Sequence, residues 1–278
     1  MINRFIIQFL CLRKACCTAF AAILFTAFAM PLQGAMILVD FGPNNDDDGR
    51  ATSSPDSNGN FWNNWRPRPG YNNSVAQVIA VGTMSPTLVD TMNISTGITL
   101  EITDDFLSNG RVNGGLLSPS AVLLGDFAVD TATEDYFYVA SSAIGSSTPN
   151  TGSFKLTGLD TNLTYDFSFF GTRQTTETRI TTYTATGANG PFSVDLTTSG
   201  TGIGTGGYNG NNDTIVSLSG LQPNALGEIE IGAVLNTGPF GYLGIMQVTS
   251  SAAAVPEPST FLMTVMGLIS LVYWCRRQ

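Results

Sequence analysis

The 278-residue chain contains no histidine, and its four cysteines all lie near its two ends, at Cys11, Cys16, Cys17 and Cys275. The span 36–250 therefore has neither a thiol nor an imidazole. Disulfides are excluded as a support of its fold, and the usual ligands of zinc, copper and haem iron are missing. Hydrolases of the Ser-His-Asp or Cys-His type are excluded in their usual form, and no G-x-S-x-G or G-x-x-x-x-G-K-[ST] motif occurs.

Charge is also scarce, at 12% of all residues. Residues 36–255 hold seven basic and twenty acidic side chains, a net charge near −13. A field of this sign repels nucleic acid, which needs cationic partners, and attracts cations such as Ca²⁺. We therefore expect no nucleic-acid partner.

Residues 1–35 have the pattern of a secretory signal peptide. Three basic residues come first, Arg4, Arg13 and Lys14. The apolar run 15–29 follows, and Ala27–Ala29 or Ala35 offers a cleavage site for signal peptidase. The alternative, a retained membrane helix, is disfavoured by the small residues and by the Pro31–Gly34 break.

The other end of the chain shows three features in a fixed order. A Pro-Glu-Pro motif comes first, in Val255, Pro256, Glu257, Pro258 and Ser259. The uncharged run 260–275 reaches the low end of a membrane-spanning helix at ~1.5 Å per residue. Arg276 and Arg277 then favour a cytoplasmic end by the positive-inside preference. With an export signal in front, this pattern predicts that 36–250 lies on the far side of the membrane.

This order resembles the PEP-CTERM sorting signal of Gram-negative and related bacteria, over about the last 24 residues. The resemblance implies that an inner-membrane exosortase recognises 251–278 and cleaves near the motif. The protein would be exported across the inner membrane, anchored transiently by the C-terminal helix, and then reside on the cell surface or in the extracellular matrix. The alternative is an ordinary membrane anchor behind a proline linker.

Between the two ends, β-rich runs alternate with turn signals, and no amphipathic helix of three turns is present. The predicted strands cover 36–42, 98–103, 136–139, 152–159, 164–171, 182–187, 192–196, 214–218, 228–234 and 242–248, with a hairpin turn at 188–190. We therefore expect an all-β domain over 36–250. Its predicted architecture is a two-layer antiparallel β-sandwich of the jelly-roll kind, flanked by the signal helix and the membrane helix.

Four parts of this span resemble the galactose-binding-like sandwich domains of bacterial surface proteins and glycan-active enzymes. They are 38–42, 60–64, 159–173 and 240–248. The resemblance supports the fold more than a function. It implies glycan binding, often with a structural Ca²⁺.

Aromatic, amide and guanidinium groups gather in one stretch, which makes it the natural glycan-binding candidate. The candidate residues are Asn63, Asn64, Trp65, Arg66 and Tyr71, with Arg173 from a later segment. Sugars stack their C–H faces on aromatic rings, and their hydroxyls bond to amides and guanidinium. The alternative is that Trp62 plugs the end of the sandwich while the asparagines satisfy loop backbone. For Arg173 the alternative is an ion pair with an aspartate.

An acidic loop offers the best cation site. Asn44, Asp46 and Asp48 match the first half of a Ca²⁺ loop, and Asp56 lies near enough in sequence to contribute. The twelfth position, where such a loop has a bidentate Glu, is Pro55. The alternative is a flexible acidic loop without a metal, and the fold requires no other cofactor.

A glycosidase needs two carboxyl groups about 5–10 Å apart across a cleft. The available clusters are Asp104-Asp105, Glu134-Asp135 and Glu228 with Glu230, which we expect to be solvated surface groups. The leading hypothesis is thus a non-catalytic surface or matrix protein that binds extracellular polysaccharide. The alternatives are a carboxylate-dependent glycan hydrolase or lyase and a purely structural matrix protein.

Overall fold

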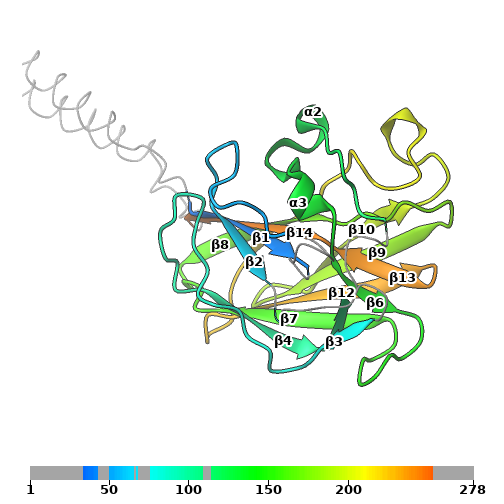
Figure 1. Cartoon of the computed structure of the whole chain (residues 1–278). Helices are drawn as coiled ribbons and strands as arrows, with labels where there is room; N and C mark the ends of the chain where they lie inside the picture. Colours follow the sequence, from blue (N-terminus) through cyan, green and yellow to red (C-terminus); the bar gives the residue numbers. More distant parts are fainter. Residues whose placement is uncertain (1–33, 43–49, 66, 68–75, 109–113, 253–278) are drawn as a thin grey trace, which may run out of the picture. The chain divides into compact units, whose positions relative to one another are not determined.

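The computed structural model describes residues 34–42, 50–65, 67, 76–108 and 114–252. The predicted signal peptide, sorting motif and membrane helix lie outside these residues. No helix among the described residues is long and apolar enough to span a membrane. The described residues from Gly34 onward form three β-sheets and a short helical segment (Figure 1).

The first sheet has the strand order β11-β8-β14-β1-β2. Its strands are β1 (Met36–Phe41), β2 (Trp62–Trp65), β8 (Leu163–Phe170), β11 (Val216–Leu221) and β14 (Ile245–Ala252). The pairs are antiparallel, except that β2 runs parallel to β1. Strand β1 is buried on both faces from Ile37 onward, which explains its almost continuous apolar sequence.

The second sheet has the order β10-β9-β12-β7-β4. Its strands are β4 (Thr99–Asp104), β7 (Thr151–Thr157), β9 (Arg179–Thr186), β10 (Phe192–Ser199) and β12 (Ile229–Thr237). Buried and partly exposed residues alternate along β7, as expected for a strand with one face on the core. The predicted hairpin is confirmed, since β9 and β10 pair antiparallel around 188–190.

The third sheet has the order β13-β6-β5-β3. Its strands are β3 (Gln77–Ile79), β5 (Phe106–Ser108), β6 (Phe137–Ala140) and β13 (Phe240–Leu243). The sequence predicts one strand through 242–248, but Gly244 divides it into β13 and β14. The Gly244 N–H donates to the Phe170 carbonyl, and the Gly244 carbonyl accepts from the Phe41 N–H. The chain therefore steps at Gly244 from the third sheet to the first.

The main core lies between the first sheet and the other two. Strands of all three sheets contribute large apolar side chains to it, such as Phe41, Phe106, Phe154, Phe167 and Phe169. This arrangement confirms an all-β fold of mainly antiparallel sheets packed face to face. The predicted strands all recur, with shifted ends, whereas β2, β3 and β5 were not predicted because they span only three or four residues.

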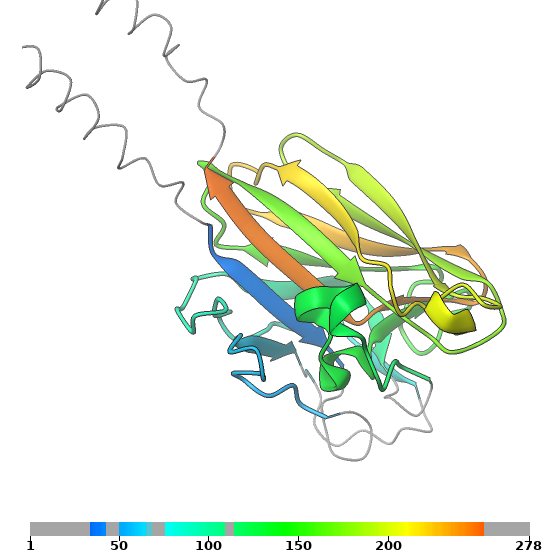
Figure 2. The same cartoon turned by 90° about the horizontal axis from the view of Figure 1, so that it is seen from above.

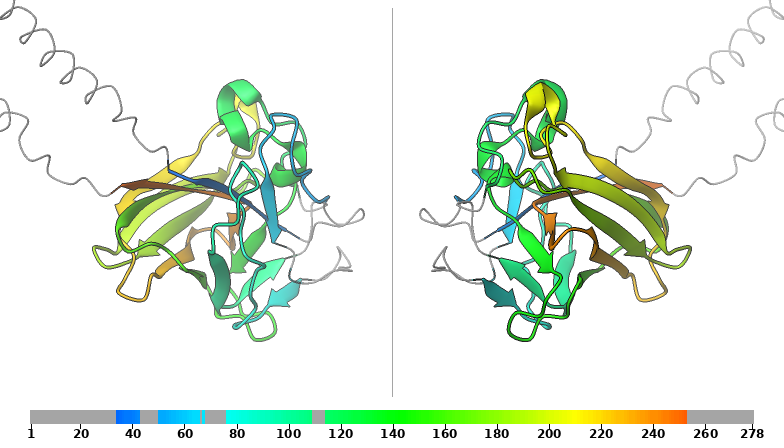
Figure 3. Two further views of the ribbon diagram at one scale, coloured as in Figure 1. Left: turned by 90° about the vertical axis from the view of Figure 1, so that its left-hand side faces the viewer. Right: turned by 90° about the vertical axis from the view of Figure 1, so that its right-hand side faces the viewer.

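A helical segment covers the outer face of the first sheet. It comprises α2 (Ala121–Leu124), the 3-10 turn η2 (Gly125–Phe127) and α3 (Asp130–Thr133). Its apolar side chains pack on those of the sheet, forming a second cluster of Leu38, Trp62, Leu116, Leu124, Phe127, Ala132, Phe170 and Ile245. The loop that carries the 3-10 turn η3 (Thr205–Gly207) lies on the same side, next to this segment (Figures 2 and 3).

Candidate functional site

The outer face of the third sheet carries a hollow of about 300 Å³. We call it the tyrosine–arginine hollow, and its lining residues are Tyr136, Tyr138, Ile144, Arg173, Arg179, Phe240 and Tyr242. Side chains alternate between the faces of a strand, so Phe137 and Val139 enter the main core while their neighbours face outward. Tyr138 and Tyr242 are cross-strand partners, which places two tyrosines side by side at this face.

The aromatic rings of the hollow pack edge to face. The rings of Tyr136 and Tyr242 have centroids 4.6 Å apart, and those of Tyr138 and Phe240 are 5.7 Å apart. Burial raises the pKa of Tyr138 to about 12 and also raises the pKa of Tyr136 and Tyr242. All three hydroxyls are therefore neutral at physiological pH and able to donate a proton in a hydrogen bond.

The two arginines of the hollow differ in how their charge is balanced. Arg179 forms an ion pair with Glu177, donates to the Tyr242 hydroxyl and lies 5.0 Å from the centroid of the Phe240 ring. Arg173 donates from Nη1 to the Tyr136 hydroxyl at 2.7 Å. It takes part in none of the ion pairs among the described residues, and its buried Nε has no hydrogen-bond partner among them. The hollow thus carries one cation that these residues do not neutralise.

A wider groove of about 610 Å³ lies beside the same loop. We call it the amide groove, and it is lined by Gly114, Gly115, Leu116, Leu117, Ser118, Gln174, Tyr208 and Asn212. The Gln174 N–H donates to the Gly114 carbonyl at 2.8 Å, and the Arg173 N–H donates to the Thr198 carbonyl at 3.0 Å. These two bonds fix the loop, so that consecutive residues line two different hollows.

The predicted stacking residue Trp65 is not a glycan contact. Its side chain is 2% exposed and packs among Phe41, Phe137 and Phe154, with ring centroids 5.7–5.8 Å from its own. A sugar ring has no access to either face of this indole. The hypothesis fails because Trp65 ends a strand whose alternation turns it into the core.

The two predicted asparagines hold backbone instead of ligand. Asn63 donates from Nδ2 to the carbonyls of Leu38 and Val89 and accepts from the Val89 N–H. Asn64 accepts from the Thr52 N–H at 2.7 Å and donates to the Thr52 carbonyl at 2.9 Å. These contacts match the alternative in which the asparagines satisfy loop backbone. Arg66 and Tyr71 lie outside the described residues.

The predicted cation site lies largely outside the described residues, since Asn44, Asp46 and Asp48 are not among them. Asp56 is described, and its carboxylate is already occupied. Its Oδ1 accepts from the N–H groups of Asn58 and Asn60, and its Oδ2 accepts from the Trp62 indole. In the described part of the chain, no group of three Asp, Glu, Cys or His side chains is placed to hold a metal ion. A structural Ca²⁺ stays a prediction for the loop 44–48.

The carboxylate pairs fall into two kinds. Asp104 and Asp105 accept hydrogen bonds from a neighbouring loop, and Glu228 forms an ion pair with Lys155, in agreement with a surface role. Glu134 and Asp135 were expected at the surface, but they are 0% and 1% exposed. They are buried because the helical segment and β6 enclose them.

Asp40 joins these two residues, and we call the three the buried acid cluster. Burial raises the pKa of Asp40 to about 8, repulsion from Glu134 adds to the rise, and the hydrogen bond from Thr52 opposes it. Glu134 in turn forms an ion pair with Arg50 at 2.8 Å. None of the three residues lines the tyrosine–arginine hollow, the amide groove or the hollow described next.

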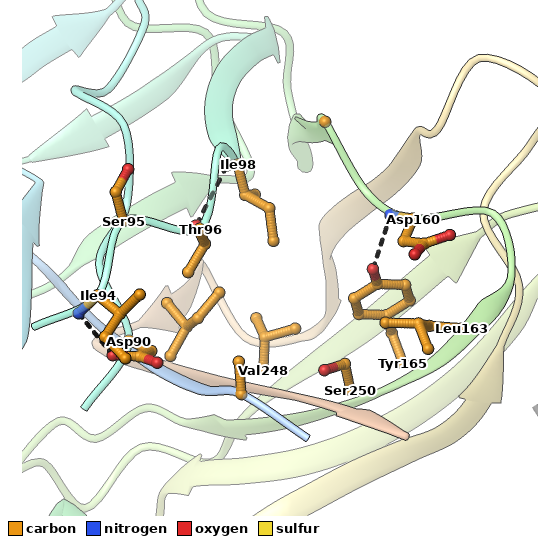
Figure 4. Close-up of a pocket in the computed structure, with 13 residues that line it drawn as sticks. Asp90, Ile94, Ser95, Thr96, Ile98, Asp160, Leu163, Tyr165, Val248 and Ser250 are labelled. Carbon is orange, nitrogen blue, oxygen red and sulfur yellow. Dashed lines mark hydrogen bonds between the residues drawn. The ribbon is translucent and has the colours of Figure 1, made fainter. Parts of the chain in front are cut away.

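A third hollow, of about 210 Å³, lies where β1 begins and β14 ends. Figure 4 shows its apolar floor and the two carboxylates at its rim. Asp90 accepts from the N–H groups of Met92 and Ile94, and Asp160 from that of Asn162. The Tyr165 hydroxyl accepts from the Asp160 N–H. Because its polar groups are used by its own loops, this terminal hollow is a poorer candidate for a ligand.

Comparison with known proteins leaves the family open, since no family model and no curated protein matches the chain. Three solved structures show a weak likeness. A family 32 carbohydrate-binding module from C. perfringens NanJ, in complex with galactose, matches at 15% identity over 55% of this chain and 94% of that chain, with a TM-score of 0.27. TmCBM61 in complex with beta-1,4-galactotriose matches at 13% over 43% of this chain and 68% of that chain, with a TM-score of 0.21. The enzymatically active domain of tailspike protein 4 of bacteriophage CBA120 matches at 12% over 65% of this chain and 19% of that chain, with a TM-score of 0.25. TM-scores this low carry no argument about this chain.

Of the predicted binding residues, only Arg173 lines a candidate site among the described residues. The tyrosines of the hollow were not predicted, although the run Tyr136–Val139 contained the signal. In a short strand that alternates aromatic and apolar residues, one face packs in the core and the other presents its rings elsewhere. Tyr208 was also missed, because its glycine-rich surroundings were interpreted as a surface connection.

Proposed function

We propose that this chain is an exported surface or matrix protein whose β-sandwich binds glycans at the loop Arg173-Gln174. The observation that carries the proposal is the position of this loop between the tyrosine–arginine hollow and the amide groove. Both concave surfaces combine aromatic rings with polar groups that a sugar needs. The buried acid cluster, by contrast, lines neither surface.

The chemistry of both surfaces suits a carbohydrate. Phe240 and Tyr208 are partly exposed and offer rings for the C–H faces of a sugar. Arg173 offers guanidinium donors, and the Gln174 side chain is exposed and makes no hydrogen bond with the other described residues. Small concave sites with apolar walls and a few convergent polar groups are the usual form of a ligand pocket.

The two ends of the chain support export and sorting. On this proposal, signal peptidase removes residues 1–35 and exosortase recognises 251–278, with Pro256, Glu257 and Pro258 as the motif. Mass spectrometry of the protein recovered from the cell surface would give both new ends. Recovery of the intact chain from the cytosol would contradict this part of the proposal without touching the binding site.

Binding is tested on a glycan array with the full chain in detergent, with and without Ca²⁺. We expect binding to at least one glycan, weakened at least about tenfold by Tyr208→Ala and by Arg173→Gln. Ser95→Ala in the terminal hollow is the matched control and should bind as the wild type does. Equal loss in the control, or no effect of the first two variants, would remove the proposed site.

The same experiment addresses the catalytic alternative. Any glycan that binds is incubated with the chain and assayed for new reducing ends. Their appearance would favour a hydrolase or lyase over a binding protein. Absence of any bound glycan, with folded protein on the array, would favour the purely structural alternative.

A further inference from the structure

We infer that the tyrosine–arginine hollow recognises the carboxylate of an acidic sugar and that Arg173 is the residue that binds it. This inference rests on the proposed glycan binding and specifies its ligand class. It predicts discrimination between a uronic acid and the corresponding neutral sugar at this one position.

The first argument is charge balance. The structure describes four basic side chains, and three of them form ion pairs. Arg50 pairs with Glu134 and Asp130, Lys155 with Glu101 and Glu228, and Arg179 with Glu177. Arg173 has no such partner among the described residues, in a span whose net charge is near −13. With twenty acidic residues in that span, a cation without a carboxylate partner marks a place where an external anion is favoured.

The second argument is geometry. The Arg173 guanidinium is fixed by one hydrogen bond from Nη1 to the neutral Tyr136 hydroxyl. Its Nη2 makes no hydrogen bond with the described residues and is not among the fully buried polar atoms, so it faces the accessible part of the hollow. Guanidinium groups bind carboxylates through parallel N–H donors. An incoming carboxylate would complete this arrangement.

The third argument is the surroundings of the charge. Tyr138 also lines the hollow, and its hydroxyl makes no hydrogen bond with other described residues. Because burial keeps this hydroxyl protonated, it adds a second donor and no negative charge that would repel the ligand. Apolar walls from Phe240 and Ile144 lower the local dielectric, which strengthens the attraction between a guanidinium and a carboxylate.

Arg179 provides a natural contrast within the same hollow. Its guanidinium is paired with Glu177 and its Nη1 with Tyr242. Its charge is thus already satisfied, and we assign it to the wall of the hollow. The specificity for an acid therefore depends on Arg173.

The test compares an oligogalacturonate with the neutral galactose oligomer of equal length and linkage. Their affinities for the full chain in detergent are measured by titration calorimetry at low and at high salt. We expect the acidic ligand to bind at least about tenfold more tightly at low salt, with the preference reduced at high salt. Arg173→Gln should remove the preference and leave the neutral ligand unchanged. Arg173→Lys keeps the charge without the planar fork and should show an intermediate preference.

The outcomes separate this inference from the proposed function. Equal affinity for both ligands in the wild type, with binding still lost in Tyr208→Ala, would overturn the carboxylate site and keep glycan binding. An acid preference that survives Arg173→Gln would place the carboxylate elsewhere. No binding of any glycan by folded protein would overturn both. If Arg173→Gln does not fold, Arg173→Lys and the salt dependence decide the question.

Discussion

Replacing Asp40 by Asn should change how the stability of the protein depends on pH. Asp40 lies in β1, is 0% exposed and accepts a hydrogen bond from Thr52 at 2.8 Å. Asn has nearly the same shape and can accept the same bond, but it cannot ionise. The substitution therefore removes a titration while leaving the packing of the buried acid cluster in place.

The sign follows from the raised pKa. Burial raises the pKa of Asp40 from 3.8 to about 8, so the folded chain holds a proton that the unfolded chain releases within this range. Folded stability is greatest below the unfolded value and is lost as pH rises toward the folded value. The loss is at most ~1.4 kcal/mol for each pH unit. Between about pH 5.5 and pH 7.5, Asp40→Asn should thus gain roughly 2–3 kcal/mol relative to the wild type.

The assay is urea unfolding of the full chain in detergent, followed by tryptophan fluorescence at a series of pH values. The neighbours that titrate with Asp40 are Glu134 and Asp135, and Arg50 balances Glu134. Asp195→Asn removes one negative charge at an exposed position and serves as the control. Parallel curves of stability against pH for the wild type and Asp40→Asn would show that the reasoning about this cluster is wrong.

Three further predictions concern the fold and its loops. Trp65→Ala should cost about 3–5 kcal/mol in urea unfolding because it opens a cavity among three phenylalanines, whereas Trp65→Phe should cost much less, since the indole N–H has no hydrogen-bond partner among the described residues; equal costs would contradict a core position. Asp56→Ala should cost about 1–3 kcal/mol because the Trp62 indole loses its acceptor, and the cost should be the same with and without Ca²⁺; a cost seen only with Ca²⁺ would mean that Asp56 is a metal ligand. Gly244→Ala should lower the thermal midpoint because its Cβ would lie 3.2 Å from the Asp135 carbonyl oxygen, and an unchanged midpoint would mean that this crossing between sheets tolerates a side chain.

The sequence predicted the long strands because their periodicity is strong. Strand β7 alternates between core and surface over seven residues, and the turn at 188–190 joins two eight-residue strands. Strand β2 has only four residues and is polar in its middle, Asn63-Asn64. Its place beside β1 depends on the side-chain bonds of these asparagines to distant backbone, which no local pattern contains.

The candidate site was harder to predict, and for a physical reason. Trp65 and Tyr138 are both aromatic residues in short strands, and their sequence neighbourhoods do not tell which face meets the core. Glu134 and Asp135 were expected in water because acidic residues rarely lose their hydration. Their burial depends on Asp40, Thr52 and Arg50, which are more than eighty residues away in sequence or nearly so. Only the assembled sheets bring these groups together.

Glycan binding at the Arg173-Gln174 loop is tested most directly by hydrogen exchange measured by mass spectrometry, on the full chain with and without a glycan that it binds. We expect the ligand to slow exchange in peptides that cover 172–175 and 240–243, and to leave 94–98 and 160–165 around the terminal hollow unchanged. Protection confined to the terminal hollow, or none near residue 173, would contradict the proposed site.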